Sequence, residues 1–229
     1  MPNNRISTLI ILALAGFFVM MPGQNLPITW SQCYGTYDQS QALRSGSYAL
    51  GFGVNNFALY DPPYDPSDSV AYDERRFDIW GKYGLGRGWE FELKYAAPTC
   101  LVMSAKRQLM TDPLGAAAKL GFGYMKGTRS NYLTDYVYDI YPGFILDRVI
   151  TGSLRVYASP RALISIHQKD RQEHTTRPLR FITQYGFGLG LKLGSDFAVA
   201  TESNWFWANN DGATYIVNQF GIGINAVIK

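Results

Sequence analysis

The residues that could perform nucleophilic or acid–base chemistry are few. The chain has only two histidines, His167 and His174. Ser165 lies two positions before His167, so both would point to the same face of a β-strand, and Asp170 follows. A hydrolase or acyltransferase built from such groups also needs an oxyanion hole, and no motif supplies one. We therefore expect a histidine at the rim of the fold and no enzyme, with a lipid-modifying barrel enzyme that uses His167 as the alternative.

The patterns that resemble metal or phosphate sites are explained without a ligand. Five acidic residues gather in one segment, but they lack the spacing and the fixed glycine of a calcium loop: Asp61, Asp65, Asp68, Asp73 and Glu74. Gly-x-Gly runs such as 186–190 are followed by no helix and fit strand alternation. The net charge of +3 does not indicate a charge-driven nucleic-acid binder. We expect no catalytic, cofactor-binding or metal-binding residue, no cofactor and no nucleic acid.

The composition favours a β-barrel. Charged residues make up 17% of the chain, against roughly 25% in an average soluble protein. Aromatic residues reach 15%, and glycine contributes 23 of 229 residues. A membrane-spanning helix needs about 20 consecutive apolar residues, and only the N-terminal stretch comes near that length. These values exclude a disordered chain and a coiled coil, and they argue against a helical membrane protein.

Apolar residues alternate with small or polar ones from residue 46 onward. In the segment 47–55, Tyr48, Leu50, Phe52 and Val54 share one face, and glycine, alanine and asparagine occupy the other. In a soluble barrel the bulky face points inward, whereas in an outer-membrane barrel it points outward to lipid. A narrow interior suits glycine and alanine, and a wet outer face made of these residues would be poorly soluble. The sequence therefore predicts the outer-membrane orientation, with a soluble lipocalin-like binding barrel as a further alternative.

The same phase places a set of charged residues inside the barrel. They are Lys82, Glu90, Glu92, Lys94, Lys119, Arg155, Arg180, Lys192 and Glu202. The interior of a small barrel is about filled by side chains, and charges buried there must pair. We expect a plug of ion pairs, and the alternative is a narrow path for an ion or solute lined by these groups.

The lengths of the connections predict the strand count. The strands are expected at 46–56, 72–84, 89–97, 100–109, 114–125, 136–146, 152–167, 179–193, 197–206 and 215–228. Short connections at 84–88, 110–113, 147–151 and 194–196 alternate with long polar ones at 56–71, 126–135 and 168–178, although 97–99 is also short. Short turns on one rim and long loops on the other are typical of bacterial outer-membrane barrels. We predict a closed, antiparallel, up-and-down barrel of about ten strands, with eight or twelve as alternatives.

The N-terminus resembles a secretory signal. Arg5 precedes an apolar core over residues 9–21, which is short for a membrane span. We expect a signal peptide over 1–31, or up to 32, with an N-terminal membrane anchor as the alternative. A lead-in over 32–45 and the barrel over 46–229 would follow. Cys33 is a candidate for lipidation, or it could form a disulfide with Cys100 after export. We favour a Cys100 that forms no disulfide and is a small buried hydrophobe.

Two stretches carry a resemblance to a known family. The lead-in and first strand read Gln-Ala-Leu-Arg-Ser-Gly-Ser-Tyr-Ala-Leu-Gly over 41–51, and 84–95 read Gly-Leu-Gly-Arg-Gly-Trp-Glu-Phe-Glu-Leu-Lys-Tyr. These segments resemble the small outer-membrane β-barrel proteins of bacteria, which are mostly uncharacterised and often lipoproteins. The resemblance covers about 33–228 and implies a strand, a tight turn and a strand in the second stretch. It also implies a lipidated cysteine where Cys33 stands. The chain departs from many such barrels by ending in Lys229.

Together these observations predict a protein of the bacterial cell outer membrane with a structural or surface-interaction role, a narrow pore being one form of it. The expected partners are outer-membrane lipid and the barrel-insertion machinery, and the sequence names no extracellular ligand. Trp89, Trp205 and Trp207 are expected in the aromatic girdles that flank the apolar band.

Overall fold

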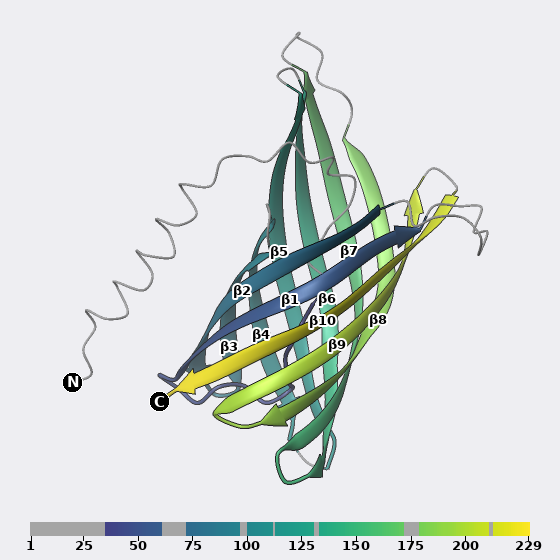
Figure 1. The fold of residues 1–229 in the computed structure, drawn as a ribbon. Coiled ribbons are helices and arrows are strands. Elements are labelled where there is room, and N and C mark those ends of the chain that lie inside the picture. The colour runs from purple at the N-terminus through teal and green to yellow at the C-terminus, as the bar shows by residue number, and fades with distance from the viewer. Residues whose placement is uncertain are drawn as a thin grey trace.

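The chain forms a closed ring of ten antiparallel strands (Figure 1). The computed structural model describes residues 35–60, 72–96, 100–111, 113–130, 133–171, 179–210 and 213–229. The strands are β1 (Tyr48–Tyr60), β2 (Tyr72–Gly86), β3 (Trp89–Ala96), β4 (Cys100–Met110), β5 (Gly115–Ser130), β6 (Leu133–Thr151), β7 (Leu154–Arg171), β8 (Arg180–Gly194), β9 (Phe197–Asn210) and β10 (Ala213–Ile228). None of the described residues belongs to a helix that is long and apolar enough to cross a membrane.

The first strand closes the ring by pairing with the last. β1 pairs with β10 from Tyr48 opposite Ile228 to Tyr60 opposite Ile216, and each remaining strand pairs with its neighbours in sequence. A closed ring has no edge strand, so each strand is hydrogen-bonded to a neighbour on both sides. The predicted up-and-down barrel of ten strands is confirmed.

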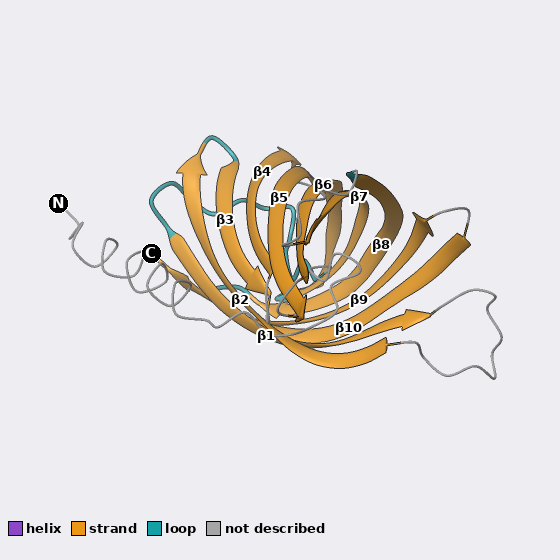
Figure 2. Cartoon of the chain, turned by 90° about the horizontal axis from the view of Figure 1, so that it is seen from above, coloured by secondary structure: helices purple, strands orange, loops and turns teal. Residues whose placement is uncertain are grey.

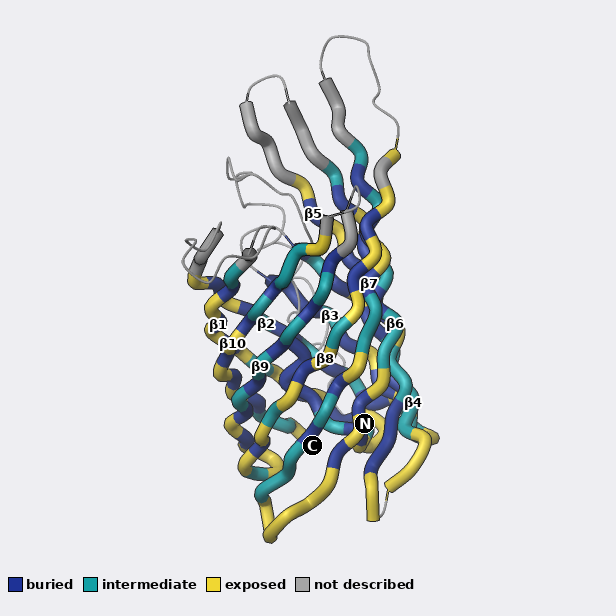
Figure 3. The backbone as a smooth tube through the Cα atoms, turned by 90° about the vertical axis from the view of Figure 1, so that its right-hand side faces the viewer, coloured by how far each residue is buried: buried dark blue, intermediate teal, exposed yellow. Residues whose placement is uncertain are grey.

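The strand faces have the predicted orientation. Phe52 is 42% exposed and Leu191 is 50% exposed on the outside of the ring, whereas Glu92 and Lys192 are 5% and 4% exposed. Figure 3 shows the resulting alternation of exposed and buried residues along the strands. Apolar side chains therefore cover the outside, and the charged residues lie in the lumen.

Two predicted connections are wrong because strand pairing continues through them. The segment 126–135 was expected to be a loop, but Gly127 pairs with Asp135 and Thr128 with Thr134. β6 likewise runs to Thr151, past the predicted turn at 147–151, and the chain turns at Gly152 and Ser153. Polar residues signal a loop in sequence, yet they remain in strands here because β6 has a partner strand on both sides. The connection at 97–99 lies outside the described residues.

The lumen has two halves of different chemistry. We name them by the connections at each rim: the short-turn half and the long-loop half. Glycine and charge were expected throughout, but buried apolar side chains occupy the long-loop half and come from nine strands. This apolar cluster comprises Phe57, Ala96, Cys100, Val102, Met125, Val137, Tyr141, Leu163, Ile182, Phe206, Ala208 and Val217. The charges of the described lumen residues are concentrated toward the short-turn half.

Candidate functional site

The described part of the lead-in enters the lumen. We call residues 35–45 the luminal segment. Tyr37, Asp38 and Ser40 are each at most 2% exposed. Viewed from above, a loop crosses the inside of the strand ring (Figure 2). The segment joins β1 through a turn in which the Gly46 N–H donates to Gly84 O at 2.9 Å. Sequence reasoning gave the lead-in no place in the lumen.

Asp38 lies at the centre of a cluster of ion pairs. Its carboxylate is 2.7 Å from Lys82 Nζ, 2.9 Å from Lys106 Nζ and 3.3 Å from Lys119 Nζ. Glu90 is 2.9 Å from Lys106, and Glu92 is 2.9 Å from Lys119 and 3.2 Å from Lys82. We call these six residues the lysine–carboxylate cluster. It holds three ammonium groups and three carboxylates, so its charges balance only when Asp38 is present.

Electrostatics favours the ionised form of Asp38. Burial by itself would raise the pKa of this carboxyl group, because a charge loses its hydration in the interior. The ammonium groups of Lys106, Lys82 and Lys119 outweigh burial and hold the pKa of Asp38 well below its usual range. The luminal segment therefore carries a fixed negative charge into a wall that would otherwise present three lysines against two glutamates.

Glu202 on β9 binds the deepest part of the luminal segment. Its carboxylate accepts the backbone N–H of Thr36 at 2.8 Å and that of Tyr37 at 2.6 Å. Tyr157 Oη donates to the same carboxylate at 2.7 Å, and Arg161 Nη2 lies 3.5 Å from it. One buried carboxylate thus satisfies two successive backbone donors that belong to no strand.

Wall side chains also bind other backbone groups along the luminal segment. Six backbone groups are involved. Three N–H groups donate: Ser40 to Asp147 at 2.6 Å, Ala42 to Gln108 at 3.0 Å and Leu43 to Glu90 at 2.9 Å. Three carbonyls accept: Gln39 O and Gln41 O from Lys106 at 2.9 and 3.3 Å, and Gly35 O from Lys94. Asp147 also pairs with Arg155 at 2.8 Å. Because buried backbone groups must be hydrogen-bonded, these wall residues replace the partners that a strand would supply.

Tyr37 fills a hollow in the wall formed by glycines. Its ring stacks on Trp80 with centroids 5.2 Å apart and planes 11° apart. A Cβ atom at Gly221 would overlap the Tyr37 hydroxyl, and one at Gly223 would lie 2.8 Å from the Trp80 ring. Tyr37 has φ of 46°, in the left-handed region that non-glycine residues rarely adopt, so its packing must offset a local backbone cost. These glycines, predicted from alternation alone, make room for a stacked aromatic pair.

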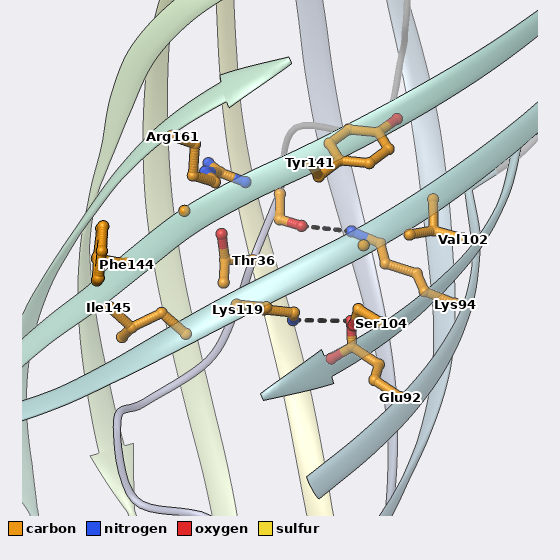
Figure 4. Close-up of a pocket in the computed structure, with 13 residues that line it drawn as sticks. Thr36, Glu92, Lys94, Val102, Ser104, Lys119, Tyr141, Phe144, Ile145 and Arg161 are labelled. Atoms are coloured by element: carbon orange, nitrogen blue, oxygen red, sulfur yellow. Dashed lines mark hydrogen bonds and ion pairs between the residues drawn. The ribbon is translucent and has the colours of Figure 1, made fainter. Parts of the chain in front are cut away.

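The luminal segment leaves little empty space around its deepest residues. A cavity of about 40 Å³ lies beside Gly35 and Thr36, with Lys119 and Arg161 in its wall (Figure 4). That volume has room for no more than a few water molecules. A larger cavity of about 280 Å³ lies at the short-turn rim, between the segment and the turns that contain Gly152 and Gly194.

The predicted interior charges fall into several groups. Lys82, Glu90, Glu92 and Lys119 belong to the lysine–carboxylate cluster. Lys94 pairs with Asp78 at 2.9 Å, Arg155 with Asp147, and Glu202 with the luminal segment. Lys192 is buried on the inner face of β8, and the side chain of Arg180 lies outside the described residues.

Sequence reasoning missed Asp38, Lys106, Asp78, Asp147 and Arg161. Strand phase was enough to find Lys106, which is two positions from Ser104 on the inner face of β4. No periodic signal marked Asp38, because its segment is not a strand.

Ser165 and His167 share the inner face of β7, away from the apolar outer surface. The Ser165 hydroxyl donates to Asp139, which also accepts from Tyr141 Oη at 2.8 Å. His174 and the side chain of Asp170 lie outside the described residues. Among the described residues, no group of three or more His, Cys, Asp or Glu is placed to hold a metal ion.

The three predicted girdle tryptophans lie at opposite ends of the barrel. Trp89 is 44% exposed at the start of β3, beside a short turn, and the Arg107 guanidinium lies 5.3 Å from its ring centre. Trp205 and Trp207 are half-buried on the outer face near the long-loop end of β9, against Phe187.

The two cysteines and the N-terminal stretch differ in what the structure describes. Cys100 is buried in the apolar cluster, as expected of a small hydrophobe. Cys33 and the expected signal peptide over 1–31 lie outside the described residues.

A ring of ten antiparallel strands with apolar residues outside and charges inside has the architecture of an outer-membrane β-barrel. No protein-family model matches the sequence, and no curated protein matches it. Small outer-membrane β-barrel proteins are among the solved structures that resemble it. One is Neisserial surface protein A (NspA), with 9% sequence identity over 80% of this chain and 99% of that chain and a TM-score of 0.45. Another is Ail, the attachment invasion locus protein of Yersinia pestis, with 13% identity over 79% of this chain and 99% of that chain and a TM-score of 0.36. The outer membrane protein OprG from Pseudomonas aeruginosa has 12% identity over 83% of this chain and 99% of that chain and a TM-score of 0.33.

Proposed function

We propose that the protein is an outer-membrane β-barrel whose lumen is closed and whose role is structural or interactive at the cell surface. The observation that carries the proposal is the distribution of side chains across the wall: large apolar groups outside, and paired charges and an internal segment within. A soluble barrel would bury the apolar groups and hydrate the charges. Outer-membrane lipid is therefore the expected partner of the outer face.

Two sets of residues that fill the lumen support a closed barrel rather than a conducting pore. The luminal segment occupies the short-turn half with buried backbone and side chains. The apolar cluster occupies the long-loop half, where Leu163, Phe206 and Val217 are 0% exposed. An ion crossing the barrel would have to displace the luminal segment and lose its hydration water in the apolar cluster.

The long-loop end supports a surface role. β5, β6 and β7 contain 16, 19 and 18 residues, respectively. Together they extend beyond the rest of the ring (Figure 1). A transmembrane strand needs about 9–11 residues, so these strands exceed what the membrane requires. The projecting sheet is the part of the barrel best placed to contact another molecule.

Two measurements test the proposal. Folded outer-membrane barrels should partition into detergent and show heat-modifiable mobility on gels, and recovery of this protein in the aqueous fraction without detergent would contradict the membrane location. In planar lipid bilayers the purified protein should give no discrete current steps. Regular steps from the intact protein would contradict the closed lumen and favour a pore.

A further inference from the structure

The luminal segment contacts the barrel as a bound peptide contacts a receptor. It forms no strand, and the ring of ten paired strands is complete without it. Its backbone is bound by side chains from four different strands, β3, β4, β6 and β9, among them Glu202 of β9 and Asp147 of β6. The barrel therefore offers a set of side-chain donors and acceptors to a chain segment that has no regular secondary structure.

Two adjacent side chains give the contact its selectivity. Tyr37 occupies the glycine-lined hollow and stacks on Trp80, while Lys94 Nζ lies 5.5 Å from the centre of its ring. Asp38 is surrounded by three ammonium groups within 3.3 Å. An aromatic residue followed by an acidic one is thus read by shape and by charge at the same time.

We propose that the short-turn half of the lumen is a peptide-binding site for a segment without regular secondary structure that carries an aromatic residue followed by an acidic residue. Residues 35–44 of the chain, Gly-Thr-Tyr-Asp-Gln-Ser-Gln-Ala-Leu-Arg, occupy this site in cis. The inference goes beyond the proposed function because it states what the lumen recognises. It makes the luminal segment an exchangeable ligand that is tethered at one end.

The exposed turn allows a test on the full chain. Arg44, Ser45 and Gly46 are exposed, so a site-specific protease sequence can be inserted between Ser45 and Gly46. The full-length protein is folded in detergent, cut, and passed over a size-exclusion column. We expect the cut segment to elute with the barrel, as detected by mass spectrometry, and the barrel to keep its heat-modifiable mobility.

Exchange then measures recognition. A fluorescent synthetic peptide of residues 35–44 should replace the cut segment in a saturable way. The Asp38→Asn peptide should bind at least about tenfold more weakly, because it leaves three buried lysines opposite two glutamates. The Gln41→Ala peptide is the matched control and should bind as the wild type does, since the Gln41 side chain is exposed. In a Lys106→Gln barrel, the difference between the wild-type and Asp38→Asn peptides should shrink.

Three outcomes would overturn the proposal. The barrel could lose its folded mobility after cutting, which would make the segment an integral part of the fold. The cut segment could be lost with no rebinding of the peptide. The Asp38→Asn peptide could bind as tightly as the wild type, which would remove the selectivity. Heat-modifiable mobility and detergent partition of the uncut protein test the membrane location separately.

Discussion

The two halves of the lumen are filled by different physical means. In the short-turn half, the wall supplies charges and the luminal segment supplies Asp38 and backbone groups that complete them. In the long-loop half, the wall fills the space with its own apolar side chains, such as Leu163 and Phe206. The first arrangement depends on complementary charges from two parts of the chain. The second is mainly apolar packing by wall side chains, with buried polar groups such as Asp139 hydrogen-bonded among them. The comparison indicates that the short-turn half carries specificity and the long-loop half carries packing.

The largest expected effect is on the short-turn half. Asp38→Ala should lower the free energy of unfolding by about 3–5 kcal/mol, because it leaves buried lysines without a partner. Cleavage at Arg44 by a protease should also become faster as the luminal segment is released. Denaturant unfolding in detergent and timed proteolysis measure the two effects. Asp196→Ala is the control: its pair with Lys229 is 59% exposed on both sides, so the loss should be below about 1 kcal/mol. Equal losses for both variants would contradict the central role of Asp38.

The second prediction tests whether the long-loop half of the lumen is energetically independent of the short-turn half. Leu163→Ala should cost about 2–5 kcal/mol through the cavity it leaves in the apolar cluster. Protease cleavage at Arg44 should stay as slow as in the wild type, because the luminal segment does not depend on that residue. The same unfolding and proteolysis assays measure both. Release of the luminal segment in this variant would show that the two halves of the lumen are coupled, and it would contradict their separate roles.

A smaller effect tests the glycine hollow. Gly221→Ala should cost about 1–3 kcal/mol, because the added methyl group overlaps Tyr37. Gly81→Ala is the matched control, since its Cβ would lie 3.6 Å from Leu50 in ordinary contact. Adding Tyr37→Phe to Gly221→Ala should restore part of the loss by removing the overlapping hydroxyl. Urea midpoints of the four proteins measure this, and a loss at Gly81 equal to that at Gly221 would contradict the hollow.

The smallest effect is the response to pH. Because the folded-state pKa of Asp38 lies below its unfolded value, this carboxylate contributes stability above the unfolded pKa of about 3.9. That contribution is lost as pH falls through the depressed folded pKa. The luminal segment should therefore stay protected from pH 8 down to about pH 5 and be released only in stronger acid, as hydrogen exchange of its amides can measure. Release near pH 6 would contradict the lysine–carboxylate cluster.

Strand phase predicted the barrel because it is a local property. Two-residue alternation fixes which side chains face the lumen, so the positions of Glu92 and Lys192 followed from their neighbours in sequence. The same phase also placed Phe57 and Leu163 inside. Phe57 was missed because it fell in the expected connection 56–71, and Leu163 because the inner face was expected to carry small or polar residues.

The position of the luminal segment could not be predicted from the sequence for a different reason. Its contacts join residues far apart in sequence, such as Thr36 and Glu202, and it has no period to read. Asp38 is a single acidic residue in a polar stretch, and only the closed ring brings three lysines around it. Ring closure is a long-range event, so the partner of Asp38 cannot be inferred from local pattern.

The order of contacts around the luminal segment has a consequence for biogenesis. Its Asp38 meets lysines of β2, β4 and β5, whereas Thr36 and Tyr37 meet Glu202 of β9. The ring closes only when β10 reaches β1, at the greatest separation in sequence. We expect the luminal segment to bind β2–β5 of the nascent sheet first and to serve as a template on which the later strands then pack. In pulsed hydrogen exchange during refolding, the amide of Leu43 should gain protection before that of Thr36, and the reverse order would contradict templating.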